Sequence, residues 1–343
     1  MKILHIGAFQ YYFYDEVVAE HFEKLGHVVL RFKTTDYLKG SLGKLETYFS
    51  FIGPLSRIMH RDIIKKYNEF KPDLILFWRC TLLDPTLLQN LKRLNNKAIL
   101  LSYNNDDPFS PLYNFGNLHN ILLWRNFIKC VPFYDINAVF RPANIKDYNN
   151  AGSKKTILFP PYFIPKLVNK IPEVPKIYDI VFIGHYTPER AQMINFLIDR
   201  NVKVKVFGTL WKEDFLSTKY SFERNIVPVS GLEYHKALKS SKIALAFYSK
   251  LNRDVYTIRS FEIPPLETVM LSEYTREMEE LFIPNKEAVY FSTNEELLEK
   301  VQILLNNEEL RISIAKNGKK CSYEKKFDVE SRVKELIKMV LNV

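Results

Sequence analysis

The sequence predicts an α/β protein with two Rossmann-like, doubly wound domains that face each other across a cleft. Short apolar runs alternate with amphipathic segments, a pattern typical of parallel strands buried on both faces and connected by helices. With 343 residues the chain is long for one hydrophobic core. Periodicity is lost between Pro160 and Pro175, where five prolines lie, and this stretch predicts the domain boundary.

The first half contains the elements of one domain. We expect strands at residues 3–6, 28–32, 74–78, 98–102, 138–141 and 156–159, and helices at 17–25, 58–67 and 86–94. Gly26 follows the first helix, and glycine commonly ends a helix because it tolerates the left-handed backbone conformation. The loops at residues 7–14 and 104–108 follow strands, so they would lie at the carboxyl edge of the sheet, where ligands bind.

The alternation restarts after the prolines. We expect strands at residues 179–184, 203–207, 243–247, 269–272 and 288–291, and helices at 189–199, 233–240, 255–263, 277–282, 295–306 and 310–318. A last amphipathic helix at 329–341 would carry Val333, Ile337 and Val340 on one side. We therefore expect domains at residues 1–165 and 166–325, followed by a C-terminal helical segment at 326–343.

The expected helix at residues 255–263 has features of a nucleotide site. Asp254 stands at a natural N-cap, and Arg259 and Glu262 are three residues apart, so they share one helix face. Free N–H groups at a helix start bind phosphate, and a carboxylate further along can hold a ribose diol. The alternative is an exposed salt bridge between Arg259 and Glu262, which would contribute little.

This region resembles a known family. The blocks Arg259-Ser-Phe-Glu-Ile-Pro264, Leu271-Ser-Glu273 and Met278-Glu-Glu-Leu-Phe282 are similar to the glycosyltransferase domain of the spore-maturation CgeB-type proteins, within the glycosyl transferases group 1 family. Matching blocks extend over most of the second half, including Tyr178–Gly184 and Val204–Gly208. The resemblance implies the GT-B fold, in which the last helix crosses back to the N-terminal domain, and a nucleotide-sugar donor. The family usually has glycine at the position of Glu267, so the turn after the helix is expected to differ.

The resemblance also implies a donor site in the second domain. Its expected residues are Gly184, His185, Tyr186, Arg190, Gly208, Arg259, Ser260 and Glu262. Glu262 would hold the nucleotide ribose, while Arg190 and Arg259 would lie near the phosphates. The spacing of Asp254 and Glu262 resembles the paired Glu-x7-Glu of retaining GT-B enzymes, which makes Asp254 a catalytic candidate besides His185. The alternatives are a simple N-cap at Asp254 and an ordinary loop histidine at His185.

The acceptor is expected at the first domain. Asp107 in the segment Asn104-Asn-Asp-Asp-Pro108 would accept the proton of an attacking hydroxyl, although these are also ordinary turn residues. Asp106 lies beside it. The aromatic loop, with Gly7, Phe9, Gln10 and Tyr11, could stack on sugar rings or on a lipid-linked acceptor, or could cap the domain interface.

Charge and composition define the expected partners. Residues 1–170 carry 23 Lys and Arg against 14 Asp and Glu, a net charge of +9, whereas residues 171–343 carry a net charge of +1. The basic half suggests an anionic acceptor, such as a glycan or a lipid-linked molecule, and is compatible with peripheral membrane contact; plain solubility is the alternative. Nucleic acid is not expected, because no arginine-rich helix or stacking motif accompanies the charge.

No cofactor or metal is expected, since no phosphate loop, dinucleotide fingerprint or zinc motif is present and no spaced carboxylates accompany the acidic pair Asp106-Asp107. Three distant cysteines and the lack of a signal peptide or of a run of about 20 apolar residues favour a cytoplasmic protein. We therefore expect a metal-independent glycosyltransferase of polysaccharide biosynthesis. The alternatives are a non-catalytic sugar- or nucleotide-binding module and a nucleic-acid-modifying glycosyltransferase.

Overall fold

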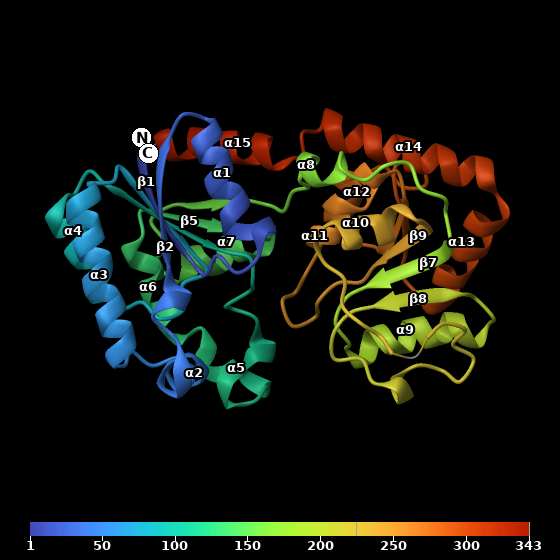
Figure 1. Cartoon of the computed structure of the whole chain (residues 1–343), viewed down its shortest axis with the longest axis horizontal. Coiled ribbons are helices and arrows are strands. Elements are labelled where there is room, and N and C mark those ends of the chain that lie inside the picture. Colours follow the sequence, from blue (N-terminus) through green and yellow to red (C-terminus); the bar gives the residue numbers. More distant parts are fainter. Residues whose placement is uncertain (224, 343) are drawn as a thin grey trace. The chain divides into compact units, whose positions relative to one another are not determined.

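The computed structural model describes residues 1–223 and 225–342 and divides the chain into two compact units (Figure 1). The first unit comprises Met1–Pro160, Lys250–Arg253 and the segment from Val329 onward. The second unit comprises Pro161–Ser249 and Asp254–Asp328. Each unit has its own parallel sheet and helices, which confirms the predicted α/β class with two Rossmann-like domains.

The first unit is built on a six-stranded sheet in the order β2-β1-β3-β4-β5-β6. Its strands are β1 (Lys2–Gly7), β2 (Val28–Lys33), β3 (Leu74–Trp78), β4 (Ile99–Asn104), β5 (Ile136–Val139) and β6 (Thr156–Leu158). All neighbouring strands pair in parallel, so their carboxyl ends share one edge. β1 and β3 are almost entirely buried, as their continuous apolar runs predict.

The helices of the first unit include several that the sequence pattern did not reveal. The expected ones are α1 (Val17–Lys24), α3 (Pro54–Phe70), α4 (Pro85–Leu94) and α15 (Val329–Leu341). The additional ones are α2 (Gly40–Phe49), α5 (Leu118–Leu123), α6 (Arg125–Cys130) and α7 (Pro142–Asn150). α7 begins where the strand at 138–141 was expected to end, because Pro142 is favoured at the first position of a helix.

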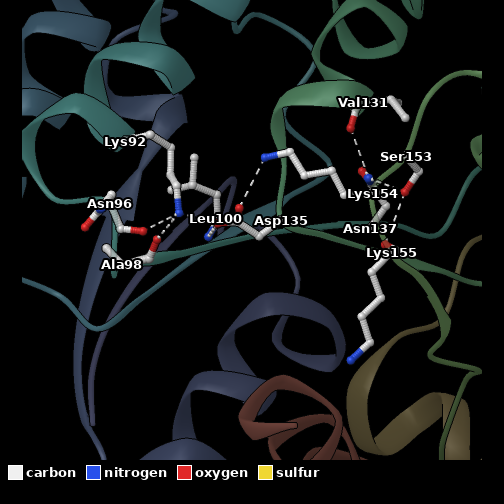
Figure 2. A network of polar contacts seen from close by, with 10 residues as sticks. All are labelled: Lys92, Asn96, Ala98, Leu100, Val131, Asp135, Asn137, Ser153, Lys154 and Lys155. Atoms are coloured by element: carbon white, nitrogen blue, oxygen red, sulfur yellow. Dashed lines mark hydrogen bonds and ion pairs between the residues drawn. The ribbon is translucent and has the colours of Figure 1, made fainter. Parts of the chain in front are cut away.

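A polar network ties β4, β5 and the C-terminal helix into the first unit (Figure 2). Lys92 Nζ donates to Asp135 Oδ2 at 2.9 Å, and the same oxygen accepts the backbone N–H of Leu100 at 2.9 Å. Lys155 Nζ donates to the carbonyl oxygen of Met339 at 3.1 Å, which joins the start of β6 to α15. These contacts lie at the amino ends of the strands, so they leave the carboxyl edge to other side chains.

The second unit is built on a five-stranded parallel sheet in the order β11-β10-β9-β7-β8. Its strands are β7 (Tyr178–Ile183), β8 (Val204–Phe207), β9 (Ser241–Ala246), β10 (Val269–Glu273) and β11 (Val289–Phe291). Its helices are α8 (Pro165–Val168), α9 (Pro188–Asp199), α10 (Gly231–Lys239), α11 (Ile258–Glu262), α12 (Arg276–Leu281), α13 (Asn294–Asn306) and α14 (Glu308–Glu324). Apart from α8, each of these elements was expected near its position, but α11 is shorter than predicted and α14 extends six residues further than residue 318, where it was expected to end.

Candidate functional site

The candidate site lies at the carboxyl edge of the second sheet. The segments after β7, β8 and β9 leave the sheet at this edge, and α11 follows the last of them. This is the edge at which doubly wound sheets bind ligands. Most of the expected donor residues lie on these segments.

Two glycines bring the ends of β7 and β8 together. Gly208 has a φ of 153°, and a Cβ atom there would overlap the carbonyl oxygen of Gly184. The same carbonyl oxygen accepts the indole N–H of Trp211 at 2.9 Å. A Cβ on Gly184 would lie 2.8 Å from Phe182 and 3.6 Å from Nη2 of Arg259. Because residue 184 has no side chain, Phe182 and the guanidinium of Arg259 approach its backbone closely.

Two arginines lie at the turn after β7. Arg190 is in the first turn of α9 and is buried, with 6% of its surface exposed, while Arg259 projects from α11 toward Gly184. Within residues 1–223 and 225–342, neither guanidinium forms an ion pair, and Nε of Arg259 is buried without a hydrogen-bond partner. Burial and the neighbouring Arg259 lower the pKa of Arg190 to about 10. Two neighbouring guanidinium groups that form no ion pair in the described residues are an arrangement expected at an anion site.

His185 lies against this pair. Nη1 of Arg190 is 3.3 Å from Nε2 of His185 and donates to the backbone carbonyl of His185 at 3.1 Å. Loss of water around the ring, together with Arg190 and Arg259, lowers the pKa of His185 to about 4. The imidazole is therefore neutral at pH 7, and its Nε2 is the acceptor that faces the guanidinium.

Glu262 is held more firmly than the sequence suggested. Only 8% of the residue is exposed, which argues against the alternative of an exposed salt bridge, and Oε2 accepts the hydroxyl of Tyr234 at 2.6 Å. No partner contacts the other oxygen, Oε1, in the described part of the chain. Tyr234 was not among the expected residues, because nothing in its local sequence signals a partner 28 positions away.

The start of α11 corrects two predictions. Its N-cap is Thr257, not Asp254, and the helix begins at Ile258. Ser260 is fully buried and its Oγ accepts the backbone N–H of Thr257 at 3.2 Å, so the two residues form a capping box. The hydroxyl of Ser260, expected at the donor, is thus used inside the helix. Asp254 lies in the preceding turn, where Oδ2 accepts the N–H of Ser249 at 3.3 Å.

The turn after α11 is closed by Glu267. This residue adopts the left-handed conformation, with a φ of 56°, and its carboxylate pairs with Lys319 at 2.9 Å. The backbone thus takes a conformation that glycine favours, although we expected the turn to differ. Tyr186, another expected donor residue, stacks on Phe215 at 4.0 Å and meets Trp211 edge-on at 5.3 Å. The ring of Tyr186 therefore lines the site beside Gly184.

In the first unit, Asp107 is an anchor for the segment Lys250–Arg253. The carboxylate is fully buried and pairs with Nε of Arg253 at 2.5 Å, while Asn144 donates to Oδ1 at 2.7 Å. Arg253 also pairs with Asp147 at 2.7 Å and has a φ of 48°. A buried carboxylate that is held in this way is poorly suited to accept a proton, so the structure does not favour Asp107 as the base that we expected. No local feature of the sequence around Arg253 indicates this long-range ion pair.

The other expected acceptor residues lie on two loops of the first unit. Asp106 pairs with Nε of Arg79 at 2.5 Å. Phe9 has a φ of 50° and donates its backbone N–H to the buried carboxylate of Asp15 at 2.6 Å, which also fills the space beside Gly7.

Beyond Phe9 the aromatic loop opens to solvent. Gln10 and Tyr11 are exposed, and 58% of Tyr11 is accessible. In the part of the chain that the structure describes, no three His, Cys, Asp or Glu side chains gather as a metal-ligand set. No helix within residues 1–223 and 225–342 is long and apolar enough to cross a membrane.

Comparison with known proteins supports this interpretation of the fold. Residues 190–338 match the family described as glycosyl transferase-like. Sucrose-phosphate synthase from Thermosynechococcus elongatus has a similar structure, with a TM-score of 0.69, 12% identity and coverage of 100% of this chain and 98% of that chain. HepE of Anabaena, solved in complex with UDP and glucose, has a TM-score of 0.66, 14% identity and full coverage of both chains.

A glycosyltransferase from Rickettsia africae is also similar, with a TM-score of 0.63, 11% identity and coverage of 98% of this chain and 97% of that chain. No curated protein sequence is similar to the chain. The architecture of two Rossmann-like units is therefore the GT-B fold of these solved structures. The similarity to the glycosyl transferase-like family is confined to residues 190–338.

Proposed function

We propose that the protein transfers a sugar from a nucleoside diphosphate sugar to a hydroxyl acceptor. The observation that carries this proposal is the pair Arg190 and Arg259 in the second unit, which lie against His185 and Gly184 and form no ion pair in the described part of the chain. A diphosphate placed there would supply the missing negative charge. HepE, similar in fold, binds UDP and UDP-glucose, which favours a uridine diphosphate donor.

The two guanidinium groups would stabilise the departing diphosphate. When the acceptor oxygen bonds to the anomeric carbon, the bond from that carbon to the diphosphate oxygen breaks and negative charge grows on the leaving group. Fixed cations in a partly dry site stabilise this charge without reorganisation. We therefore propose a reaction that needs no divalent metal, with Arg190 and Arg259 in the place of the ion.

Three side chains would complete the donor site. Oε1 of Glu262 has no partner among the described residues and would accept the ribose hydroxyls, while Tyr234 holds the other carboxylate oxygen. The neutral imidazole of His185 can accept the proton that the acceptor hydroxyl loses. Asp254 remains our second catalytic candidate, whereas the ion pair with Arg253 removes Asp107 from this role.

The acceptor would be anionic, a glycan or a lipid-linked molecule. This part of the proposal rests on the net charge of +9 in residues 1–170 and on the exposed aromatic side chain of Tyr11. Complementary charge raises the local concentration of such an acceptor. A role in building polysaccharides fits these features.

Thermal-shift measurements with nucleotides test the donor site, since a ligand bound to the folded state raises the melting temperature. UDP, GDP, dTDP and their sugars are compared on the wild type, Glu262→Gln and Glu299→Gln, an exposed glutamate of the same unit that serves as control. We expect the best nucleotide to lose its shift with Glu262→Gln and to keep it with Glu299→Gln. An unchanged shift in both variants would show that the ribose site is misplaced. Binding without sugar transfer or donor hydrolysis would favour the non-catalytic module.

A further inference from the structure

Helix α2 in the first unit presents its apolar side chains to solvent. Leu42, Leu45 and Tyr48 recur at helical spacing and are all exposed, whereas Gly43 and Glu46 on the other side are buried. In a helix that only covers a core, the apolar stripe faces inward. α2 has the reverse orientation.

Two contacts fix this orientation. The buried carboxylate of Glu46 accepts the N–H of Leu55 at 2.9 Å and the N–H and hydroxyl of Ser56 at 2.9 and 2.6 Å, at the start of α3. Gly43 lies so close to the backbone of Leu38 that a Cβ atom would overlap it. Because both residues must face inward, the apolar stripe of α2 has to face out.

Helix α5 and the turn before it extend the apolar surface. Phe115, Leu118 and Ile121 are 84%, 50% and 47% exposed. α5 lies beside α2 (Figure 1), where Nδ1 of His119 is 2.7 Å from the carbonyl oxygen of Tyr48 and the two rings stack at 5.1 Å. We refer to the six exposed residues of α2, α5 and the turn as the apolar platform.

The surroundings of the apolar platform are basic. The segments 37–61 and 109–129 contain six Lys and Arg residues but one acidic residue, Glu46, which is buried. The basic residues are Lys39, Lys44, Arg57, Arg61, Arg125 and Lys129. Two flanking acids contact members of this set: Asp36 pairs with Lys39 at 3.1 Å, and Asp62 lies 3.8 Å from Arg61. Lys44 and Arg57 are exposed without such a partner in the described residues.

We propose that the apolar platform docks the protein on a membrane surface that contains anionic phospholipids. Exposed apolar side chains gain by entering the boundary between head groups and acyl chains, and Lys and Arg beside them gain from negative head groups. A second copy of the chain fits less well, because it would bring the same positive charges face to face. This inference does not depend on the proposed transfer reaction.

Flotation of the full chain with lipid vesicles tests the proposal. We expect binding to vesicles of phosphatidylcholine with added phosphatidylglycerol, little binding to phosphatidylcholine alone, and weaker binding at high salt. Equal binding to both lipids at every salt concentration, or binding to neither, would overturn the proposal.

Matched variants locate the surface. Leu118 and Leu94 are 50% and 49% exposed, but Leu94 lies on α4, outside the apolar platform. We expect Leu118→Gln to weaken binding to anionic vesicles by about threefold to tenfold and Leu94→Gln to leave it unchanged. Lys44→Gln combined with Arg57→Gln should weaken it by about tenfold or more, since each basic residue near such a surface contributes about fivefold. Equal effects of Leu118→Gln and Leu94→Gln would contradict the assignment.

Two controls keep the result interpretable. All variants should have the melting temperature of the wild type, and a nucleotide should raise it by the same amount as in the wild type. Loss of vesicle binding alone then concerns the apolar platform, and loss of the nucleotide effect concerns the donor site. Size-exclusion chromatography without lipid tests the alternative that a second copy of the chain covers the apolar platform. A dimer that Leu118→Gln converts to a monomer would overturn the membrane assignment and show that a second copy covers the platform.

Discussion

Gly208 contacts Gly184 so closely that the carbonyl oxygen of one residue occupies the space where a Cβ of the other would lie. This contact sets the distance between the segments that follow β7 and β8. The indole of Trp211 donates to the same carbonyl oxygen at 2.9 Å, so Gly184 is fixed from a second direction. The turn at which Arg190 and Arg259 lie therefore depends on the absence of a side chain at residue 208.

Gly208→Ala should destabilise the protein by about 3 kcal/mol, because the methyl group overlaps a backbone carbonyl that cannot move freely and because a φ of 153° is unfavourable for alanine. Gly231→Ala is the matched control in the same unit: its φ of 57° is also positive, but no atom lies within 4 Å of the added methyl group. That control should cost about 1 kcal/mol. Urea unfolding of both variants checks this, and equal losses would contradict the overlap.

Arg190→Gln and Arg259→Gln should each weaken the binding of a nucleoside diphosphate by about 1.5–3 kcal/mol, the contribution of a hydrogen bond to a charged group. Arg200→Gln, at the exposed end of α9, should have no effect. Calorimetric titration with UDP gives the affinities. Losses of the same size in all three variants would show that the two arginines do not form the phosphate site.

A chelator should leave transfer activity largely unchanged, because the same two guanidinium groups would neutralise the leaving diphosphate. The measurement is the rate of sugar transfer before and after EDTA, followed by addition of manganese. Complete loss with EDTA and recovery with manganese would refute the proposed electrostatic role of Arg190 and Arg259.

The fold could be predicted well from sequence because its strands are continuous apolar runs. β3 was expected at the residues where it occurs, and α15 likewise, since alternation and helical spacing are local signals. α2 was not expected, because its apolar stripe faces solvent and its inward face consists of Gly43 and Glu46. No local pattern predicts a helix that buries its carboxylate.

The candidate site could be predicted only in part. Gly184 and Arg190 were expected at the carboxyl edge of the sheet because they follow a strand end and match a family block, and the structure has both there. The bond from Tyr234 to Glu262 and the pair of Asp107 with Arg253 could not be found, since they join residues 28 and 146 positions apart. Such contacts depend on the packing of whole elements and leave no local signal.

Asp107→Asn should destabilise the first unit, because Arg253 then loses one of its two carboxylate partners. We expect a loss of about 2 kcal/mol, less than for a fully buried pair, since a third of the Arg253 side chain is exposed. Arg253→Gln should cost a similar amount, and the double variant should cost clearly less than the sum. Urea unfolding of the three variants gives the coupling. Additive losses would show that the two residues do not act as a pair.

His5 should make the stability of the first unit depend on pH. The ring is fully buried and has no hydrogen-bond partner among the residues that the structure describes, and burial, assisted by Arg31, lowers its pKa to about 3. The unfolded chain takes up a proton below pH 6.5 and the folded protein does not, so stability is lost as the pH falls toward 3. At pH 5 the loss is about 2 kcal/mol.

His5→Leu should remove this pH-dependent component of stability. When the pH falls from 8 to 5, the free energy of unfolding of the variant should therefore rise by about 2 kcal/mol relative to that of the wild type. His119→Leu is the control, because the imidazole of His119, unlike that of His5, makes a hydrogen bond and lies at an exposed position. Urea unfolding at the two pH values measures the difference. A parallel decline of the wild type and His5→Leu would show that other groups cause the acid sensitivity.

Glu267 offers a test of backbone strain, because it holds a left-handed conformation with a φ of 56° at the end of the turn after α11. Glu267→Gly and Glu267→Ala both remove the ion pair with Lys319, a half-exposed contact that contributes little. Glycine adopts this conformation without strain, whereas alanine keeps a cost of about 1 kcal/mol. We therefore expect Glu267→Gly to be more stable than Glu267→Ala by about 1 kcal/mol in urea unfolding. If the alanine variant is the more stable of the two, the turn does not hold residue 267 in the left-handed region.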